Sequence, residues 1–298
     1  MIEKDRAKRY RIISFCEEAE LACECPLRAA FFRQRRLKSC CNASPPDNRL
    51  GLSKLFTSFE PEKLEMTVAS WYQEHGIDVH VGKRATRIDR ANKLVIGDGG
   101  LTVPYDYLVL ATGSYAWVPP VPGAKQKRVF VYRTIQDCRE IIEASRDSKS
   151  AAIIGGGLLG LEAVKACYDM KVPTVHAIDT NAGLMSRQLD LEGGTLLKDK
   201  IEALAAGTDQ EIKVHLNART EEVLGDGTVS GLNFSDGRSL ACDLLVICTG
   251  IRPRDELAKE CGLDIGKYGG VVVDDGLRTS DDSIFAIGEV ACHKGKRL

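Results

Sequence analysis

The sequence of 298 residues lacks an excess of charge of either sign. It has 41 basic and 42 acidic side chains, which leaves a formal net charge of -1 at pH 7. A chain with this balance has no extended field that could hold nucleic acid or an anionic membrane. Two short basic stretches, 33–38 and 293–297, are typical of a solvated surface or a chain end. Nucleic acid is therefore not expected as a partner.

Long apolar runs are also lacking. The longest, residues 151–164, contains three successive glycines and is shorter than the ~20 residues that span a bilayer. The opening residues, Met-Ile-Glu-Lys-Asp-Arg, include no apolar stretch of the kind found in secretory signals. We therefore expect no membrane segment and a cytoplasmic location.

The cysteines lack the spacing of a metal or disulfide framework. Their number, 11, is odd, which favours a reducing compartment. Cys23, Cys25, Cys40 and Cys41 cluster near the start, but their CxC and CC spacings fit CxxC-based metal patterns poorly. Free thiols and no metal site are the favoured interpretation. A thiol-rich metal-binding or redox-sensing protein built on these four residues is a minor alternative.

The sequence does contain short β-branched runs that alternate with stretches of helical periodicity. This order is typical of parallel βαβ units and predicts an α/β fold. A proline-rich crossing at 118–123 predicts a linker between two domains. The first half of the chain is expected to contain strands at 10–15, 77–81, 85–88 and 107–111, a helix at 61–75 and a hairpin at 93–103.

The densest motif is a glycine-rich turn. Gly155, Gly157 and Gly160 directly follow an apolar strand at 151–154, in the order GxGxxG, and a helix is expected to run from there to Met170. In such a turn the first glycine permits a tight bend, the second lets a pyrophosphate approach the backbone, and the third lets helix and strand pack closely. The start of the helix favours the negative charge of the pyrophosphate. The motif predicts dinucleotide binding.

The acid that ends the next strand bears on the choice of nucleotide. Asp179 follows a predicted strand at 172–178 and lies nineteen positions after Gly160. A carboxylate here accepts hydrogen bonds from the adenosine ribose and repels a 2′-phosphate. The residues that follow, Thr-Asn-Ala-Gly, offer no arginine to pair with such a phosphate. NADH is therefore favoured over NADPH, and an ordinary loop acid is the alternative interpretation of Asp179.

Several further stretches occur together with this motif in one order. They are 105–120, 130–134, 249–254 and 286–289, and they include the strand-to-turn junctions Ala-Thr-Gly-Ser and Ala-Ile-Gly-Glu. Together with the glycine turn they resemble the FAD-dependent pyridine nucleotide-disulfide oxidoreductase superfamily. Within it they are most similar to the flavoprotein region of the large subunits of assimilatory NAD(P)H nitrite reductases.

The resemblance implies a specific architecture. It implies two Rossmann-like, three-layer dinucleotide-binding domains, with an NADH domain inserted into an incomplete FAD domain. The first part of the FAD domain would cover residues 1–121, the NAD(H) domain 122–243, and the return to the FAD domain 244–298. The implied cofactors are FAD and NADH.

The resemblance also assigns roles to individual residues. Glu162 would reach toward the nicotinamide, and Gly250 would line the NADH cleft. The residues implied to contact FAD are Glu17 at its ribose, Ala85 at its adenine, Thr112, Gly113 and Arg133 along its length, and Gly288 and Glu289 at its ribitol and pyrophosphate end. A purely structural role stays open for most of them, including Ala85 and Arg133.

Three departures from the family pattern are expected to matter. The first strand, glycine turn and helix of the FAD domain are absent, which removes the usual pyrophosphate site for FAD. In the stretch 23–28, Cys25 fills the place of the family's arginine. The chain also stops shortly after Glu289, without iron-sulfur or sirohaem modules, so it is expected to be truncated at both ends. A CxxxxC redox pair is lacking as well, which argues against disulfide reductase chemistry.

The expected chemistry is hydride transfer from NADH to FAD, followed by delivery of electrons to an external acceptor, an iron-sulfur or sirohaem module by resemblance. This chemistry demands no protein acid or base, and Glu162 is the best candidate for a residue at the reacting ring. The alternative is an NADH-binding remnant that holds no flavin and does not catalyse electron transfer.

Overall fold

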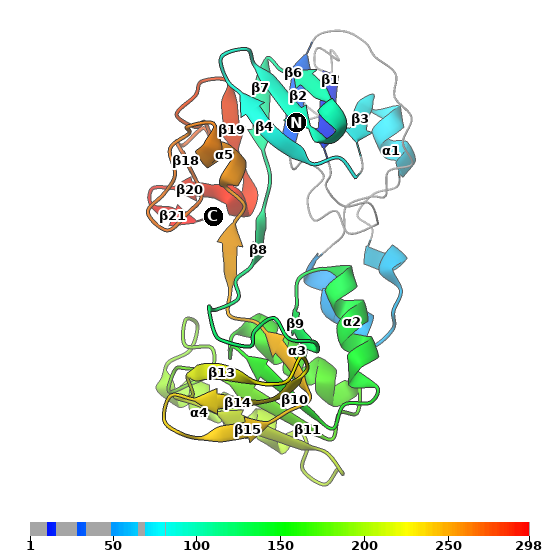
Figure 1. The fold of residues 1–298 in the computed structure, drawn as a ribbon, viewed down its shortest axis with the longest axis vertical. Coiled ribbons are helices and arrows are strands. Elements are labelled where there is room, and N and C mark those ends of the chain that lie inside the picture. Colours follow the sequence, from blue (N-terminus) through cyan, green and yellow to red (C-terminus); the bar gives the residue numbers. More distant parts are fainter. Residues whose placement is uncertain (1–10, 16–28, 34–48, 65–68, 81, 298) are drawn as a thin grey trace. The chain divides into compact units, whose positions relative to one another are not determined.

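The structure, a computed structural model, describes residues 11–15, 29–33, 49–64, 69–80 and 82–297. The chain forms two compact units (Figure 1). Unit 1 comprises residues 1–49, 61–115 and 252–298, and unit 2 comprises 50–60 and 116–251. The expected domain boundaries at 121/122 and 243/244 stay predictions.

Unit 2 is built on a five-stranded parallel sheet whose strands pair in the order β12-β11-β10-β16-β9. The strands are β9 (Val129–Val131), β10 (Ser150–Ile154), β11 (Thr174–Ile178), β12 (Glu211–His215) and β16 (Leu244–Ile247). From β10 the chain continues to β11 on one side, while β16 lies on the other. The carboxyl end of β10 is thus the point where the strand order reverses, which is where open α/β sheets bind ligands.

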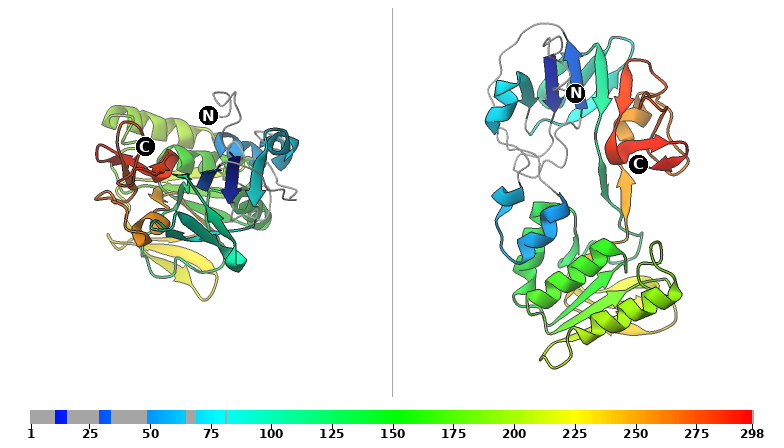
Figure 2. Two further views of the ribbon diagram at one scale, coloured as in Figure 1. Left: turned by 90° about the horizontal axis from the view of Figure 1, so that it is seen from above. Right: turned by 180° about the vertical axis from the view of Figure 1, so that it is seen from behind.

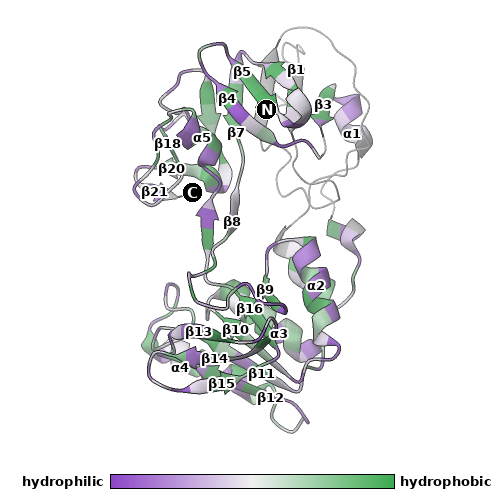
Figure 3. Cartoon of the chain, in the orientation of Figure 1, coloured by the Kyte–Doolittle hydropathy of each residue, from purple (hydrophilic) through white to green (hydrophobic). Residues whose placement is uncertain are grey.

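Two further layers cover this sheet (Figure 2). Helices α2 (Ile135–Ser145), α3 (Leu158–Asp169) and α4 (Leu191–Ala203) pack on one face. The other face is covered by an antiparallel sheet of β13 (Thr220–Gly225), β14 (Val229–Phe234) and β15 (Ser239–Ala241), which the sequence reasoning missed. The core between the two sheets consists of Ala152, Ile178, Ala218, Val223, Val229, Leu232, Phe234, Cys242, Leu245 and Ile247. The apolar colour gathers on the central strands, while α2 carries both kinds of residue (Figure 3).

Unit 1 contains a mixed five-stranded sheet with the order β19-β7-β2-β1-β3. Its strands are β1 (Arg11–Phe15), β2 (Ala29–Arg33), β3 (Ile77–His80), β7 (Tyr107–Leu110) and β19 (Ile284–Ala286). The pairs β1·β3 and β7·β19 are parallel, whereas the central strand β2 runs antiparallel to both of its neighbours. Strands were expected at β1, β3 and β7, but β2 was not predicted.

The rest of unit 1 surrounds this sheet. The expected hairpin is present as β5 (Leu94–Gly97), the turn η4 (Asp98–Gly100) and β6 (Thr102–Pro104), with β4 (Ala85–Asp89) alongside. The expected helix at 61–75 is described as η3 (Pro61–Leu64) and α1 (Ala69–Glu74). The other elements of unit 1 are α5 (Glu256–Glu260), β18 (Val271–Val273), η5 (Gly288–Val290), β20 (Ala291–His293) and β21 (Lys296–Arg297). Strands β8 (Ser114–Ala116) and β17 (Ile251–Pro253) lie where the chain passes from one unit to the other. The short helix η2 (Arg49–Phe56) lies on the first segment of unit 2.

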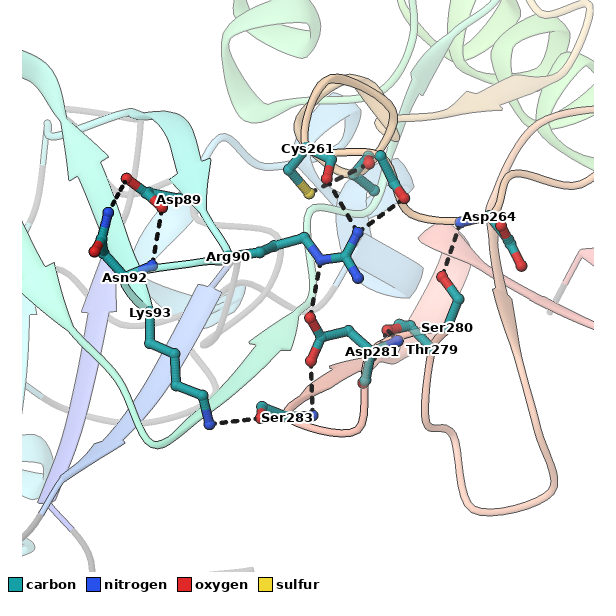
Figure 4. Close-up of polar contacts among 12 residues, drawn as sticks. Asp89, Arg90, Asn92, Lys93, Cys261, Asp264, Thr279, Ser280, Asp281 and Ser283 are labelled. Atoms are coloured by element: carbon teal, nitrogen blue, oxygen red, sulfur yellow. Dashed lines mark hydrogen bonds and ion pairs between the residues drawn. The ribbon is translucent and has the colours of Figure 1, made fainter.

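A polar network fixes the approach to β19 (Figure 4). Arg90, just after β4, donates from Nε to Asp281 Oδ2 at 2.8 Å and from Nη1 to the carbonyl oxygens of Cys261 and Gly262. Asp281 in turn accepts from the backbone N–H of Ser283, one residue before β19. The Arg90 guanidinium thus links the end of β4 to the loop before β19 and to the residues after α5. The fold class expected from the sequence, α/β with two Rossmann-like units, is confirmed.

A buried histidine pair in unit 2 makes its stability depend on pH. His176 on β11 is 5% exposed, and its Nδ1 lies 3.1 Å from Nε2 of His215 on the neighbouring strand β12. Burial, with help from His215 and Lys213, lowers the pKa of His176 to about 4, against an ordinary value of 6.5. Between pH 6.5 and pH 4, His176 is therefore protonated in the unfolded chain but neutral in the folded chain. This contribution to stability is present above pH 6.5 and is lost as pH falls toward 4.

We expect the free energy of unfolding of unit 2 to drop by about 3 kcal/mol between pH 6.5 and 4. The protein has two tryptophans, Trp71 in unit 1 and Trp117 in unit 2. Urea unfolding followed by Trp117 fluorescence in a Trp71→Phe background reports on unit 2 alone. His176→Leu should reduce the pH dependence of the free energy of unfolding. His75→Gln, a change at an exposed site, should leave that dependence unchanged. An unchanged slope in His176→Leu would contradict the assignment.

Candidate nucleotide-binding site

The turn after β10 requires glycine at two of its three motif positions. Gly155 has a φ of +121°, which side chains rarely adopt, and a Cβ there would overlap the carbonyl oxygen of Cys248 at the end of β16. A Cβ on Gly160 would overlap the carbonyl oxygen of Gly155. These two glycines therefore let α3 pack directly against the strand ends, as the motif predicts.

The second glycine of the motif, Gly157, is different. Gly157 has an ordinary φ of -86°, and nothing lies within 4 Å of the place that its Cβ would occupy. Neither backbone conformation nor packing inside the protein explains a glycine here. An open position at a helix start is what a close approach of pyrophosphate to the backbone requires.

The start of α3 offers free hydrogen-bond donors. Gly157 is its N-cap, no described side chain caps it, and the first turn contains no acid. Leu158 and Leu159 are 64% and 39% exposed, so this end of the helix faces solvent. Uncapped N–H groups together with the helix dipole favour an anion. The residues of the turn thus fit a dinucleotide pyrophosphate.

Asp179 lies against the same turn. Its Oδ2 accepts from the N–H of Gly156 at 2.6 Å, and its Oδ1 accepts from the backbone N–H and side-chain amide of Asn181, both at 2.7 Å. The carboxylate therefore holds the turn in addition to any ligand contact. Its position beside the turn agrees with the expected ribose site, and the contact with ribose itself stays a prediction.

Glu162 lines a hollow beside the glycine turn. The hollow has a volume of about 320 Å³ and lies between one face of α3 and the η2 segment. Glu162 is half-buried, and burial raises the pKa of its carboxyl group. The residues around the hollow are Ser53, Phe56, Thr57, Leu158, Leu161, Glu162, Lys165, Ala166 and Asp169.

Two other residues implied by the resemblance lie in unit 2. Gly250 has a φ of +110° with open space beside it, and its carbonyl oxygen accepts from the N–H of Trp117. Arg133 precedes α2, where its backbone N–H donates to Asp137. Asp137 and Thr134 form a reciprocal capping box at the start of that helix. Contacts of Gly250 and Arg133 with a nucleotide stay predictions.

Four residues expected at FAD lie together in unit 1. Thr112 and Gly113 follow β7, and Gly288 and Glu289 follow its parallel neighbour β19. Gly113 and Gly288 have φ values of +64° and +69°, each with open space beside it. The carboxyl ends of these neighbouring strands thus form one edge with room for a ligand.

Ser114 and Arg254 complete this edge, and sequence reasoning missed both. Ser114 donates from Oγ to Glu289 Oε2 at 2.8 Å, and the carbonyl oxygen of Arg254 accepts from Thr112 Oγ1. Both occur in the quoted stretches, directly after Thr-Gly and within Gly-Ile-Arg-Pro-Arg. Their position within those motifs is the only sequence feature that could have identified Ser114 and Arg254 as candidates.

The described residues fit FAD only in part. The donors and open glycines after β7 and β19 suit one end of the cofactor. Between β1 and β7, however, the described central strand is antiparallel, with Ala29 opposite Leu110, so it does not lead into a glycine turn at this edge. Ala85 starts β4 and packs against the core. Glu17, Cys23, Cys25, Cys40 and Cys41 lie outside the described residues.

Neither a metal-binding group of side chains nor a membrane-spanning helix is present among the described residues. No group of three or more His, Cys, Asp or Glu side chains there is placed to hold a metal ion. No helix there is long and apolar enough to cross a membrane.

A pair of glycine variants separates binding from folding. In Gly157→Val the new side chain enters open space and blocks the approach of pyrophosphate, so we expect a folded chain that has lost NADH affinity at least 100-fold. In Gly160→Val the side chain meets the backbone of Gly155, so we expect unit 2 to be strongly destabilised. NADH binding by calorimetry and thermal unfolding check both. Retained affinity in Gly157→Val would contradict the assignment of the turn.

Comparisons with known proteins agree with this geometry. The nitrite reductase (NADH) large subunit of Escherichia coli is 39% identical over 293 residues, which cover 98% of this chain and 31% of that protein. The assimilatory nitrate reductase electron transfer subunit of Bacillus subtilis is 35% identical over 253 residues, 84% of this chain and 32% of that protein. The chain thus spans about a third of the length of these relatives.

A solved structure shows the same fold. The ferredoxin reductase of Rhodopseudomonas palustris superposes with a TM-score of 0.78 and 28% identity, covering 85% of this chain and 62% of that one. The family described as pyridine nucleotide-disulphide oxidoreductase matches residues 29–297, which include both edges described above. The chain therefore belongs to the pyridine nucleotide-disulphide oxidoreductase family.

Proposed function

We propose that this chain binds NADH and forms the NADH-oxidising, flavin-dependent part of an oxidoreductase of the nitrite reductase type. The observation that supports the proposal is the turn at Gly155–Gly160, where packing requires two of the glycines and the open position at Gly157 leaves room for a pyrophosphate. The relatives named for nitrite reduction and for electron transfer in nitrate reduction support this class of activity. The acceptor would be an iron-sulfur or sirohaem module outside this chain, and the expected location is the cytoplasm.

The chain's own contribution is binding and orientation. The N–H groups at the start of α3 would hold the pyrophosphate, Asp179 the adenosine ribose, and Glu162 the nicotinamide end. A bound flavin supplies the ability to accept a hydride and pass electrons on. The described residues fit FAD only at one end of the cofactor.

A second candidate function is NADH binding without a flavin. The antiparallel β2 at the centre of the unit 1 sheet favours it, because a strand in that direction does not deliver a glycine turn to the edge formed by β7 and β19. The two candidates share the nucleotide site of unit 2 and differ only in unit 1.

Flavin uptake distinguishes the two candidates. The full chain is purified, incubated with FAD and freed of excess, and its absorbance is recorded before and after anaerobic addition of NADH. The oxidoreductase should retain a yellow chromophore that NADH bleaches, and Gly157→Val should retain the colour but resist bleaching. NADH binding with no retained FAD would overturn the flavin-dependent proposal and leave the second candidate.

Nucleotide preference tests the role of Asp179. Asp179→Asn keeps an oxygen that can accept from Gly156 N–H but removes the charge, so the affinity ratio of NADPH to NADH should rise roughly tenfold, as expected for losing a charged hydrogen bond. Asp179→Ala also loses the support of the turn and should weaken NADH more than NADPH. Titration of each variant with both nucleotides measures this. Equal losses for NADH and NADPH would contradict the ribose assignment.

A further inference from the structure

The Asp179 carboxylate already accepts several hydrogen bonds from its own chain. A carboxylate has about four lone-pair sites, two on each oxygen. The described residues fill three of them. The Gly156 N–H donates to Oδ2 at 2.6 Å, and the backbone N–H and side-chain amide of Asn181 both donate to Oδ1 at 2.7 Å. One site therefore remains, on Oδ2, whereas the adenosine ribose offers two neighbouring hydroxyl groups.

Two of these three donors are fixed by the fold. A Cβ on Gly156 would lie 2.6 Å from Asp179 Oδ2 and 2.7 Å from Cδ2 of Leu184, a fully buried side chain. The carboxylate thus packs directly on the glycine turn. The backbone of Asn181 is held as well, because its carbonyl oxygen accepts from the N–H of Asn217 at 3.0 Å. Neither backbone N–H can leave the carboxylate unless this part of the chain is rearranged.

The third donor, the side-chain amide of Asn181, can be displaced. Asn181 is exposed, and among the described residues its amide bonds only to Asp179. Exposed side chains change rotamer readily. A ribose hydroxyl that displaced the amide would exchange one hydrogen bond to Oδ1 for another, so the exchange adds little net affinity.

The open site on Oδ2 lies beside the expected position of the pyrophosphate. Oδ2 bonds to Gly156, which directly precedes the open position at Gly157. A ribose attached to a pyrophosphate on this turn can therefore donate one hydroxyl to Oδ2 without displacing a donor. Its second hydroxyl needs the site on Oδ1 that the amide of Asn181 occupies.

We propose that Asn181 is a specificity-determining residue of the nucleotide site: its side-chain amide competes with one hydroxyl of the adenosine ribose for Oδ1 of Asp179, so that only the other hydroxyl contributes strongly to affinity. This inference rests on the proposed NADH binding and on the ribose role of Asp179. It predicts a chain that distinguishes sharply between the two ribose hydroxyl groups.

The test compares NADH with its two analogues that lack the 2′- or the 3′-hydroxyl of the adenosine ribose. Calorimetry with the full chain should show one analogue about tenfold weaker than NADH, as expected for losing a hydrogen bond to a carboxylate, and the other within about twofold of NADH. In Asn181→Ala, NADH should bind roughly five- to tenfold tighter, because the second hydroxyl gains Oδ1. The analogue that lacks this second hydroxyl should not gain, so both analogues become clearly weaker than NADH.

A double-mutant cycle shows whether Asn181 acts through Asp179. In an Asp179→Ala background, Asn181→Ala should change NADH affinity less than about twofold, since no carboxylate is left to compete for. Asn233→Ala is the matched control. Its amide also donates to a carboxylate in unit 2, Glu222 Oε2 at 3.2 Å, and its loss should change neither NADH affinity nor the ratio between the analogues. Thermal unfolding checks that each variant is folded.

The outcomes are distinct. A merely structural role would make Asn181→Ala weaken NADH and leave the ratio between the analogues unchanged, and this result would overturn the inference. Two analogues that are equally weak in the parent chain would overturn it as well. If the parent chain binds NADH but is insensitive to both hydroxyls, the nucleotide site stands and the roles of Asp179 and Asn181 fail. If the parent chain binds no NADH, the proposed function itself fails.

Discussion

The close approach of α3 to the ends of β10 and β16 is the constraint on which the site in unit 2 depends. It exists because Gly155 and Gly160 leave no side chain between the helix and the strands. Once the helix starts there, its uncapped donors lie at the carboxyl edge of the sheet. The bond from Gly156 N–H to Asp179 then joins this turn to the end of β11. Because Gly155 and Gly160 have no side chains, the start of α3, the open position at Gly157 and Asp179 all lie at this edge of the sheet.

The sequence predicted this turn well because everything that defines it is local. Strand, glycines and helix follow one another within about twenty residues, and each glycine has a steric reason that can be stated without a structure. The same holds for the hairpin around Asp98–Gly100, because aspartate and glycine residues are typical of tight turns. The pairing partners of these segments are another matter, since pairing is set between residues far apart in the chain.

Strand β2 and the Tyr132 environment show why the rest could not be predicted. Ala29 pairs with Leu110, and no local pattern in either segment specifies that contact or its antiparallel direction. Tyr132 meets Ser53 and Phe56 from a segment about eighty residues earlier in the chain, so a pattern around Tyr132 shows only an aromatic residue after a strand. The edge with Thr112 and Glu289 could be predicted only because both residues lie in stretches that resemble a known family.

The open position at Gly157 bears on how this site is interpreted. Folding alone would accept a side chain at position 157, because its φ of -86° is ordinary and nothing lies within 4 Å of the place that a Cβ would occupy. Local rules of this kind are usually broken at functional sites, where a cost in stability is offset by binding. The open position lies at the start of α3, and a nucleotide whose pyrophosphate approached the backbone there would account for it.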